Sequence, residues 1–598
     1  MKKRILKYSS ILLALLLAGS CNDDFLERYP LDQLSSETYW NTEAELRNYN
    51  NSLYELIRND RNYPIMIGMG KGGGLNFDEG LWYMDQMSDN LGATHNRAQL
   101  WYEVSTGNHF VQNNSRAGGW LGWDLIRRIN FGLANYDRAD ISQEIINRYK
   151  GEARLFRGWF YAEKVSKFGD VQWIEKVLNI DSEELYGTRD DREFVMEKVL
   201  EDLDYAIEHL PANWGDGANP GRIHKWAALT VKARICLFEG TWRKYHGGSN
   251  PDFWLQQSAD AAKQVMDEGG FSLWNTGNPH LDYRHAHWQT YTGHENNPEV
   301  IYWRKHEPEV NTGFWSRLFW NYNGGATRSF VEDFLCEDGL PITLSPLYQG
   351  DDEIEDVFVN RDPRLRQCVF SMEDKELLNY ANDPDAIYPK LQGQSIPGRN
   401  SSNTGYHVVK HWNAVDELTA RHYHGASSPT LRLGEVLLTY AEAKAELGTI
   451  TQEDLDISIN LLRDRADMPH LGLNPPMDPR YADDGVSALI IEIRRERRIE
   501  LFLEGHRYND LRRWAQGKYL GKPLMGIRWD ETAQNRFPGA TVQGTEVPHT
   551  VTGEMVPYID VHKGTSFEPK FDPGKHYLWP LPLNVLSENP NLGQNPGW

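Results

Sequence analysis

The stretch from Ile490 to Trp514, IIEIRRERRIELFLEGHRYNDLRRW, combines a helical pattern of apolar residues with a very high density of charge. The apolar residues that recur at helical spacing are Ile493, Leu501, Tyr508 and Leu511. Further large apolar side chains, Phe502, Leu503 and Trp514, stand among the charges and spread the apolar surface around the helix. We therefore expect neighbouring parts of the protein to cover some of the charges, and we assign the stretch a structural role. The alternative is a solvated charged helix with one apolar stripe.

Opposite charges in this stretch stand three residues apart, which is the spacing of neighbours on a helix surface. The pairs are Glu492/Arg495, Arg497/Glu500, Glu504/Arg507 and Asp510/Arg513. Ion pairs that are covered by other residues fix geometry more than they add stability. Gly505 lies inside the pattern, and glycine costs about 1 kcal/mol relative to alanine in a helix. We therefore predict close packing or a bend at Gly505.

The chain has 598 residues, of which 40% are apolar, and this is enough for a large core. It carries 85 acidic and 63 basic side chains, which gives a formal net charge of −22. This balance argues against nucleic acid as a partner, because phosphate binding needs a basic surface. Anionic polysaccharides are disfavoured for the same reason. The cysteines beyond Cys21 are Cys236, Cys336 and Cys368, and their number and spacing indicate neither a zinc site nor a disulfide framework.

The N-terminus has the pattern of an export signal. Four basic residues precede the apolar run Ile11–Ala18, which is too short to span a bilayer, and small residues stand directly before Cys21. This arrangement resembles a bacterial lipobox, in which the cysteine is acylated and becomes the first residue of the mature protein. Ala18 stands where the commonest version has leucine, and the alternative is ordinary cleavage beside an incidental cysteine. Loss of residues 1–20 removes four positive charges and no negative ones, so the net charge changes from −22 to −26.

Much of the remaining chain shows the apolar period of helices. The predicted helices cover Glu43–Ile57, Trp120–Asn135, Tyr149–Phe168, Glu193–His209, Lys225–Gly240, Leu255–Glu268, Leu431–Leu447, Leu455–Ala466 and Val486–Gln516. Residues 63–102 and 269–427 are instead rich in glycine and aromatic residues, which indicates long loops, and an irregular proline-rich tail follows the last helix. The sequence therefore predicts a mostly α protein. Helical hairpins stacked in a solenoid fit the pattern, although no clean 34-residue period marks tetratricopeptide repeats.

No catalytic or cofactor-binding motif is complete. Gly68, Gly70 and Gly73 satisfy G-x-G-x-x-G, but the helix that a dinucleotide fold requires does not follow them. His294-Glu295 lacks the second histidine of a zinc-protease helix, and the chain has no G-x-S-x-G motif. A glycosidase needs two placed carboxylates, and 85 acidic residues allow any pair to be nominated. We therefore expect a protein that is not an enzyme and that has no cofactor.

Four histidines are close enough in sequence to form a metal cluster. They are His280, His285, His287 and His294. Their neighbours Trp288 and Tyr291 fit a polar, aromatic surface equally well. We predict no metal site here.

Tryptophan is abundant, with 21 residues in the chain, and many of them lie outside the helical patterns. Most of these rings are expected to fill the core. Rings that stay exposed offer flat apolar faces to sugar rings, with Asn, Asp and Arg nearby for the hydroxyls. We predict a glycan-binding platform built from rings of two loop regions. The first region supplies Trp82, and the second supplies Trp288, Tyr291, Trp315, Trp320 and Tyr322.

The run RRERRIELFLEGHRYNDLRRW, which ends at Trp514, resembles the C-terminal signature of the SusD/RagB family, the surface glycan-binding lipoproteins of Bacteroidetes. The matching positions are Glu496, Arg497, Glu500, Leu501, Glu504, Gly505, Arg507, Asp510, Leu511 and Trp514. The tail Trp579–Trp598 is similar to the family's closing segment, and residues 22–27, after Cys21, resemble its acidic surface-export signal. The resemblance implies a SusD-like fold with a scaffold of four tetratricopeptide-like units. The family's binding loops vary, so no binding position is carried over.

The resemblance also implies an organisation and a role. We expect a signal peptide over residues 1–20, an N-terminal region over 21–230 and a C-terminal region over 231–598, in one intertwined globular unit. Such a protein would be a cell-surface lipoprotein of the outer membrane. It would capture an oligo- or polysaccharide and pass it to a SusC-like TonB-dependent transporter, on which it sits as a hinged lid. A lipid-anchored glycoside hydrolase and a surface adhesion protein are the alternatives, and the sequence does not identify the sugar.

Overall fold

Helices dominate the structure, as the sequence predicts. The computed structural model describes residues 39–54, 81–92, 99–114, 119–215, 221–287, 294–304, 324–371, 373–374, 390–394, 401–411 and 428–598. The longer helices are α2 (Glu43–Asn51), α6 (Trp123–Leu133), α7 (Gln143–Phe168), α8 (Arg192–His209), α9 (Lys225–His246), α10 (Pro251–Glu268), α16 (Leu433–Glu446) and α19 (Ala488–Glu500). Among the described residues, every helix is too short or too polar to span a bilayer.

Several shorter helices connect and flank the long ones. The α-helices are α4 (Leu81–Gln86), α5 (Gln99–Ser105), α11 (Asp282–His285), α13 (Arg328–Asp333), α14 (Arg364–Cys368), α17 (Gln452–Asp456), α18 (Ile459–Arg465), α20 (Arg507–Arg513), α21 (Glu531–Arg536) and α22 (Leu583–Glu588). The 3-10 helices are η2 (Ser52–Tyr54), η4 (Tyr136–Arg138), η5 (Glu183–Tyr186), η6 (Asp356–Phe358), η8 (Pro479–Asp484), η9 (Gly517–Tyr519) and η10 (Pro590–Leu592).

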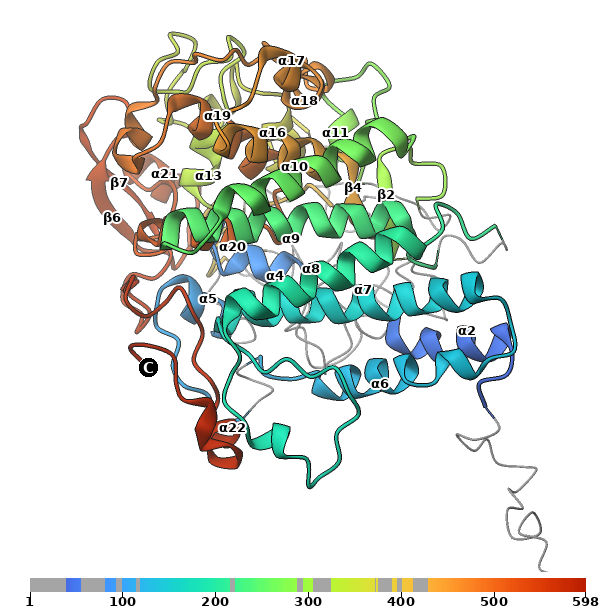
Figure 1. Ribbon diagram of the computed structural model, residues 1–598. Coiled ribbons are helices and arrows are strands. Elements are labelled where there is room, and N and C mark those ends of the chain that lie inside the picture. Colours follow the sequence, from blue (N-terminus) through green and yellow to red (C-terminus); the bar gives the residue numbers. More distant parts are fainter. Residues whose placement is uncertain are drawn as a thin grey trace, which may run out of the picture.

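The long helices form a stack in which each packs against the next (Figure 1). Helix α7 packs on α8, α8 on α9, α9 on α10, α10 on α16 and α16 on α19. Their ends follow local sequence rules. Ser142 accepts a hydrogen bond from the Ile145 N–H and starts α7 well before the predicted Tyr149, and Gly169, at φ +72°, ends it.

Helix α9 extends beyond its predicted end. The sequence suggests a stop at Gly240, whereas the helix continues to His246. A Cβ atom on Gly240 would lie 2.8 Å from the Leu255 side chain and 2.9 Å from its backbone nitrogen. Gly240 is therefore required by the close approach of α9 and α10 rather than by helix termination.

The predicted single helix over Val486–Gln516 is interrupted. Helix α19 ends at Glu500, and α20 begins at Arg507. Between them, Leu503 at φ +60° and Gly505 at φ +78° adopt the left-handed conformation, which no α-helix contains. The bend predicted at Gly505 is confirmed. Similarly, the predicted helix Leu455–Ala466 is divided into α17 and α18.

Small antiparallel sheets join segments that are distant in sequence. The strands are β1 (Leu91–Gly92), β2 (Val300–Arg304), β3 (Gly325–Ala326), β4 (Ser428–Arg432), β5 (Met525–Arg528), β6 (Gly544–Pro548) and β7 (Met555–Asp560). Strand β1 pairs with β3, β2 with β4, and β7 lies between β5 and β6. The three-stranded sheet corrects the prediction of an irregular tail. The sequence also does not predict α4 and α5, because their surroundings are rich in glycine and aromatic residues.

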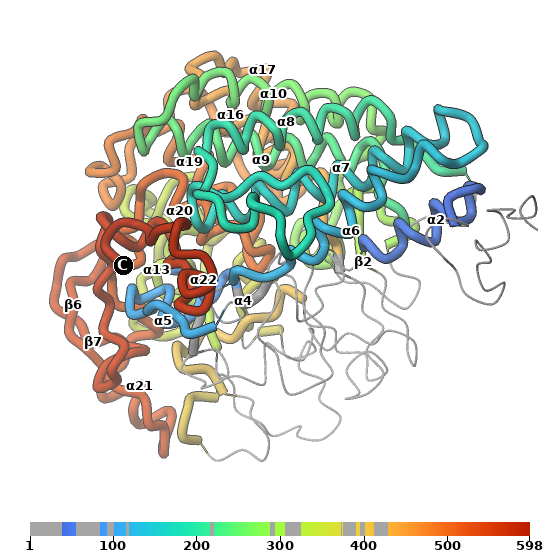
Figure 2. Tube along the Cα trace, turned by 60° about the horizontal axis from the view of Figure 1, so that its bottom comes forward, coloured from blue at the N-terminus to red at the C-terminus, as the bar shows by residue number. Residues whose placement is uncertain are grey.

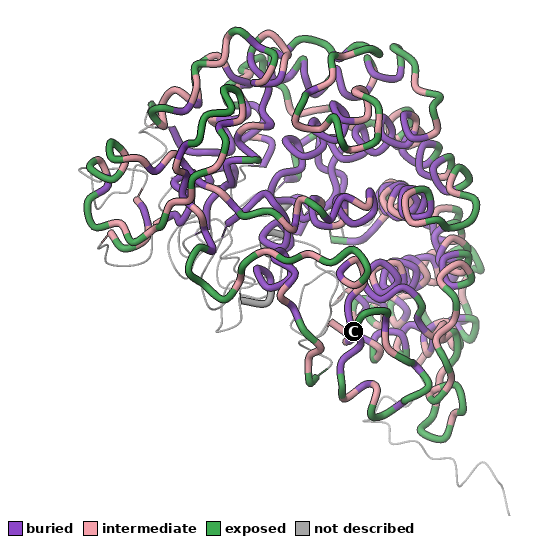
Figure 3. Tube along the Cα trace, turned by 90° about the vertical axis from the view of Figure 1, so that its left-hand side faces the viewer, coloured by how far each residue is buried: buried purple, intermediate pink, exposed green. Residues whose placement is uncertain are grey.

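One hydrophobic core runs through the described part of the chain, from Trp40 before α2 to Leu592 in η10. Buried residues form the interior of the described fold, and exposed residues lie along its outer edge (Figure 3). Helix α4, from the N-terminal part of the chain, packs on α20 (Figures 1 and 2). Many tryptophans belong to this core, as expected. They include Trp40, Trp101, Trp120, Trp159, Trp254, Trp529 and Trp579.

Candidate functional site

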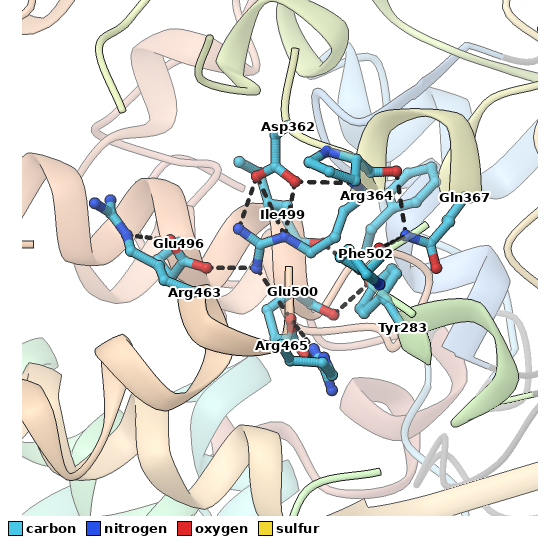
Figure 4. A network of polar contacts seen from close by, with 12 residues as sticks. Tyr283, Asp362, Arg364, Gln367, Arg463, Arg465, Glu496, Ile499, Glu500 and Phe502 are labelled. Carbon is cyan, nitrogen blue, oxygen red and sulfur yellow. Dashed lines mark hydrogen bonds and ion pairs between the residues drawn. The ribbon is translucent and has the colours of Figure 1, made fainter. Parts of the chain in front are cut away.

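A buried carboxylate at the end of α19, Glu500, is surrounded by three arginines. Its oxygens lie 2.7 Å from Arg465 Nη2, 2.8 Å from Arg432 Nη1 and 3.2 Å from Arg364 Nη1. Figure 4 shows Arg364 between Asp362 and the two glutamates of α19, Glu496 and Glu500. Burial alone would raise the pKa of Glu500, but the three arginines hold it well below its ordinary range. The carboxylate is therefore ionised at neutral pH.

A second buried carboxylate, Glu504, lies in the turn between α19 and α20. It is 2.6 Å from Lys410 Nζ, 2.7 Å from Arg432 Nε and 3.2 Å from His287 Nε2. Burial opposes its charge, but Arg432 and Lys410 hold the pKa of Glu504 well below the ordinary value. Burial lowers the pKa of His287, which favours the neutral imidazole. Arg432 bonds both Glu500 and Glu504, so the two carboxylates belong to one network.

The same turn holds α4 and the residues after it. Asp89 is 2.7 Å from Arg507 Nε and 3.1 Å from Arg498 Nη2. Burial would raise the pKa of Asp89, but these two arginines bring it below the ordinary value. Asp85 accepts a hydrogen bond from the Leu503 N–H, and its other oxygen has no partner among the described residues. Burial raises the pKa of Asp85 to about 8, so this carboxyl is protonated at neutral pH.

The ion pairs differ in part from those expected on a helix surface. Glu492 and Arg495 pair at 3.2 Å, and Asp510 and Arg513 pair at 2.9 Å, as predicted. The predicted Arg497/Glu500 and Glu504/Arg507 contacts are replaced by contacts with distant segments, and Arg497 bonds Asp510 at 2.9 Å. The break after Glu500 changes the helical spacing, and burial brings other elements against these side chains. The expectation that neighbours cover the charges is confirmed, because all of these side chains are at least nine-tenths buried.

This charged network contacts the described residues that flank the two loop regions of the predicted platform. We call these flanking residues the loop stems. Trp82 is followed by Asp85, which lies in α4, and by Asp89, which lies just after α4. His287, which directly precedes Trp288, bonds Glu504, and its ring lies 5.3 Å from that of His411. Strand β1 pairs with β3 at Gly92 and Gly325, and β2 pairs with β4 at Arg304 and Ser428. These pairings hold residues that flank the two loop regions next to one another.

The predicted platform residues themselves are mostly not described. Trp82 lies in α4, but its side chain is outside the described part of the structure. Cys21, Trp288, Tyr291, Trp315, Trp320 and Tyr322 lie outside the described residues. These assignments stay predictions. The sequence does not reveal the network partners, which include Asp89, His287, Lys410 and Arg432, because they come from distant segments without a shared local pattern.

The histidines considered for a metal site have different surroundings in the structure. His287 is buried against Glu504, and His294 packs beside Trp303, with 5.7 Å between the ring centroids. His280 is exposed, and burial lowers the pKa of the half-buried His285. Among the described residues, no group of three or more His, Cys, Asp or Glu side chains is arranged to hold a metal ion.

Residues 278–598, more than half of the chain, match the family model described as the SusD family. The chain belongs to the SusD family. Residues 24–237 of this SusD-family protein also match a model described as starch-binding, associating with the outer membrane. The resemblance seen in the sequence is thereby confirmed.

Relatives of this SusD-family protein match it over most of their length. SusD-like protein P25 of Formosa agariphila is 27% identical over 533 residues, which cover 85% of this chain and 90% of that protein. A SusD-like carbohydrate-binding protein from Bacteroides fragilis has a structure with a TM-score of 0.69 and 22% identity, covering 93% of this chain and 100% of that one. Surface glycan-binding protein A from Bacteroides fluxus gives a TM-score of 0.59 and 17% identity, with coverage of 93% and 100%. These structures confirm the SusD-like fold.

Proposed function

We propose that this SusD-family protein binds an oligo- or polysaccharide on aromatic rings of the two loop regions whose described stems contact the charged network. The arrangement of the loop stems supports this proposal most directly. Asp85, Asp89 and His287 are all held by buried ion pairs or hydrogen bonds to the segment that joins α19 and α20. Rigid stems reduce the conformational entropy that loops lose when they bind a ligand. The names of the similar proteins, carbohydrate-binding and glycan-binding, agree with this function.

Weak binding is expected from such a platform. A stacked ring removes roughly 60 Å² of apolar surface from water, and at about 25 cal/mol per Å² this contributes roughly 1.5 kcal/mol. Three rings contribute about 4.5 kcal/mol, and hydrogen bonds to hydroxyls are largely offset by desolvation. The dissociation constant is therefore expected in the millimolar to high-micromolar range. Weak binding suits a protein that releases its ligand to a transporter.

Replacing Trp315 or Trp320 with alanine is expected to weaken glycan binding about tenfold, because one stacked ring contributes about 1.4 kcal/mol. The melting temperature should stay close to that of the parent protein. Isothermal titration calorimetry against neutral glycans, together with thermal unfolding, measures both quantities. Phe253→Ala is the matched control, because this ring on α10 is 48% exposed and lies outside the proposed platform. If no alanine variant of the six predicted rings loses affinity, or if affinity falls only with unfolding, the platform is wrong.

Incubation with a panel of glycans, followed by assays for binding and for new reducing ends, distinguishes the proposed function from its alternatives. A glycan panel should contain α- and β-glucans, mannan, xylan, galactan and fructan. Binding without new reducing ends supports capture. New reducing ends indicate a glycoside hydrolase, and the absence of binding to any glycan favours an adhesion protein.

We further propose that the protein is anchored to the outer membrane by lipid on Cys21, faces outward, and passes its glycan to a SusC-like TonB-dependent transporter. The basic, apolar and small-residue pattern before Cys21 and the acidic residues after it support this localisation. The family description that mentions the outer membrane agrees with it. We also propose that residues 21–230 and 231–598 form one intertwined unit.

Cys21→Ala is expected to leave the protein unprocessed or soluble, because the thiol that receives the lipid is lost. Labelling of intact cells with a membrane-impermeant reagent should fall to background, while total protein stays detectable. Cys236→Ala is a control, since this buried cysteine in α9 has no part in anchoring. Normal processing and firm membrane attachment of the Cys21→Ala protein would exclude the lipid anchor.

A further inference from the structure

A groove of about 560 Å³ lies between the start of α6, the segment that leads into η5, and the C-terminal elements α22 and η10. In Figure 1, α22 and α6 lie at the lower edge of the helical stack. None of the residues that line the groove belongs to the charged network around Glu500 and Glu504. The volume falls within the usual range of small-ligand sites.

Aromatic rings form part of the groove wall and are held in place by their packing. Trp120 and Trp123 both line it, with 5.3 Å between their centroids, and Trp123 also packs edge-on against Phe160 of α7 at 5.4 Å. Beneath them, the buried Lys164 amine lies 5.8 Å from both indole centroids and donates a hydrogen bond of 2.8 Å to the Gly119 carbonyl. These contacts fix the rings before any ligand binds.

Tyr186 supplies an exposed ring on the other wall. This residue, at the end of η5, is 52% exposed. The segment that carries it is held by Asn589, whose side-chain amide donates to the carbonyls of Leu185 and Gly187 at 3.1 and 2.9 Å. The groove lining therefore includes rings from the start of α6 and from η5, and the η5 segment is tied to the C-terminal elements.

The charges around the groove balance. Two carboxylates, Asp124 and Glu588, and two cations, Arg127 and Lys176, line it. Most are already engaged within the protein, since Asp124 pairs with Arg128, Lys176 with Glu184, and Arg127 donates to the Leu178 carbonyl. A lining without net charge favours a neutral ligand over an ionic one.

The wall also contains an unsatisfied donor. The buried indole N–H of Trp123 has no hydrogen-bond partner in the part of the chain that the structure describes. Buried polar groups are normally paired. A ligand oxygen or an ordered water that gained access to this donor would satisfy it, and a purely apolar ligand would not.

From these features we propose that the groove is a second glycan-binding site, for a short neutral oligosaccharide segment. An exposed ring at Tyr186, further rings in the wall, and a lining of balanced charge with polar side chains are features that suit a neutral sugar. The inference rests on the proposed function, because it assumes that the protein meets glycans. A polysaccharide that reaches both sites would bind more tightly than a short oligosaccharide, since the second contact becomes intramolecular.

The test uses the full mature chain carrying Trp315→Ala and Trp320→Ala, which weaken the proposed loop platform. Its tryptophan indole groups are labelled with ¹⁵N, and the Trp123 signal is identified by its loss in Trp123→Phe. Neutral hexasaccharides from α- and β-glucans, mannan, xylan, galactan and fructan are the probes. At least one of them should shift the Trp123 signal in a saturable way. Tyr186→Ala should weaken that response about tenfold without changing the melting temperature, whereas the control Phe253→Ala should leave it unchanged.

The two proposals fail in different ways. If a hexasaccharide binds the parent chain but neither shifts the Trp123 signal nor responds to Tyr186→Ala, the second site is wrong and the proposed function stands. If no hexasaccharide binds the parent chain or shifts any indole signal, the proposed function is contradicted and the second site with it. Intact folding of Tyr186→Ala and Trp123→Phe is checked by their thermal unfolding.

Discussion

Glu500→Gln is expected to lower the free energy of unfolding by about 3–5 kcal/mol, because it leaves buried arginines without their shared carboxylate. Arg364, Arg432 and Arg465 all contact this side chain, and each is at least nine-tenths buried. Glutamine keeps the shape of the side chain but removes its charge. The three arginines then share one carboxylate fewer, although Arg364 keeps Asp362 and Arg432 keeps Glu504. Urea unfolding at pH 7 measures the loss.

A matched surface variant separates burial from the loss of a carboxylate as such. Glu144 pairs with Arg148 on the surface of α7, where its side chain is 76% exposed. Glu144→Gln is expected to change stability by less than about 0.5 kcal/mol. Glycan affinity per folded molecule should survive in both variants. A Glu500→Gln protein as stable as the parent would contradict the structural role, and one that folds normally but loses affinity would place the network in the binding site.

The network also predicts a response to acid. The folded-state pKa of Glu500 lies well below the ordinary value of 4.5. A carboxyl with a lowered pKa contributes stability that is present above the unfolded value and is lost as the pH falls below it. The stability difference between the parent and Glu500→Gln should therefore shrink as the pH is lowered from about 5 to 3.

Asp85→Asn is expected to have the opposite effect at neutral pH and to stabilise the protein by about 2–3 kcal/mol. Burial raises the pKa of Asp85 from its ordinary value of 3.8 to about 8. At pH 7 the unfolded chain has lost this proton and the folded protein has kept it, which favours unfolding by about 4 kcal/mol. Asparagine removes this penalty and keeps an acceptor for the Leu503 N–H. An amide without partners offsets the gain by about 1–2 kcal/mol.

The sign of the effect depends on pH in a defined way. A carboxyl with a raised pKa contributes stability below its unfolded value and loses it as the pH rises toward its folded value. Near pH 4 Asp85→Asn should therefore cost about 1–2 kcal/mol, because only the amide penalty remains, and the effect should become a gain that grows up to about pH 8. Guanidinium unfolding at pH 4.5, 6 and 7.5 measures the trend. A gain that stays constant with pH, or a loss at pH 7.5, would contradict the protonated state of Asp85.

Asp89→Asn is the control for this prediction, because Asp89 lies four residues further along the same segment, just after α4. Asp89 is ionised against Arg498 and Arg507. Its replacement leaves the buried Arg507 without its carboxylate and takes one of two carboxylates from Arg498, which keeps Asp333. The loss is expected to be about 3 kcal/mol at every pH from 5 to 8. Equal losses from both aspartate variants would show that the two environments do not differ as described.

The sequence predicts local features of this fold better than its long-range contacts. The apolar period locates α7, α8 and α10, because an amphipathic helix repeats its pattern along the chain. It also indicates the bend at Gly505, since glycine weakens a helix. The Glu500 contacts with Arg364, Arg432 and Arg465 join segments without a shared pattern, so pairing rules for one helix surface miss them. For the same reason, loop composition predicts aromatic binding residues but does not determine which rings are exposed.

The contact between Asp89 and Arg507 joins residues that are 418 positions apart. During synthesis, α4 is complete long before Arg507 has been made. Asp85 and Asp89 lack their partners throughout this interval, and burial without them costs free energy. Helix α4 therefore docks only after the segment joining α19 and α20 is available, and loop closure over such a distance is slow. Late completion of the fold would suit the export proposed above, in which the chain crosses a membrane before it folds.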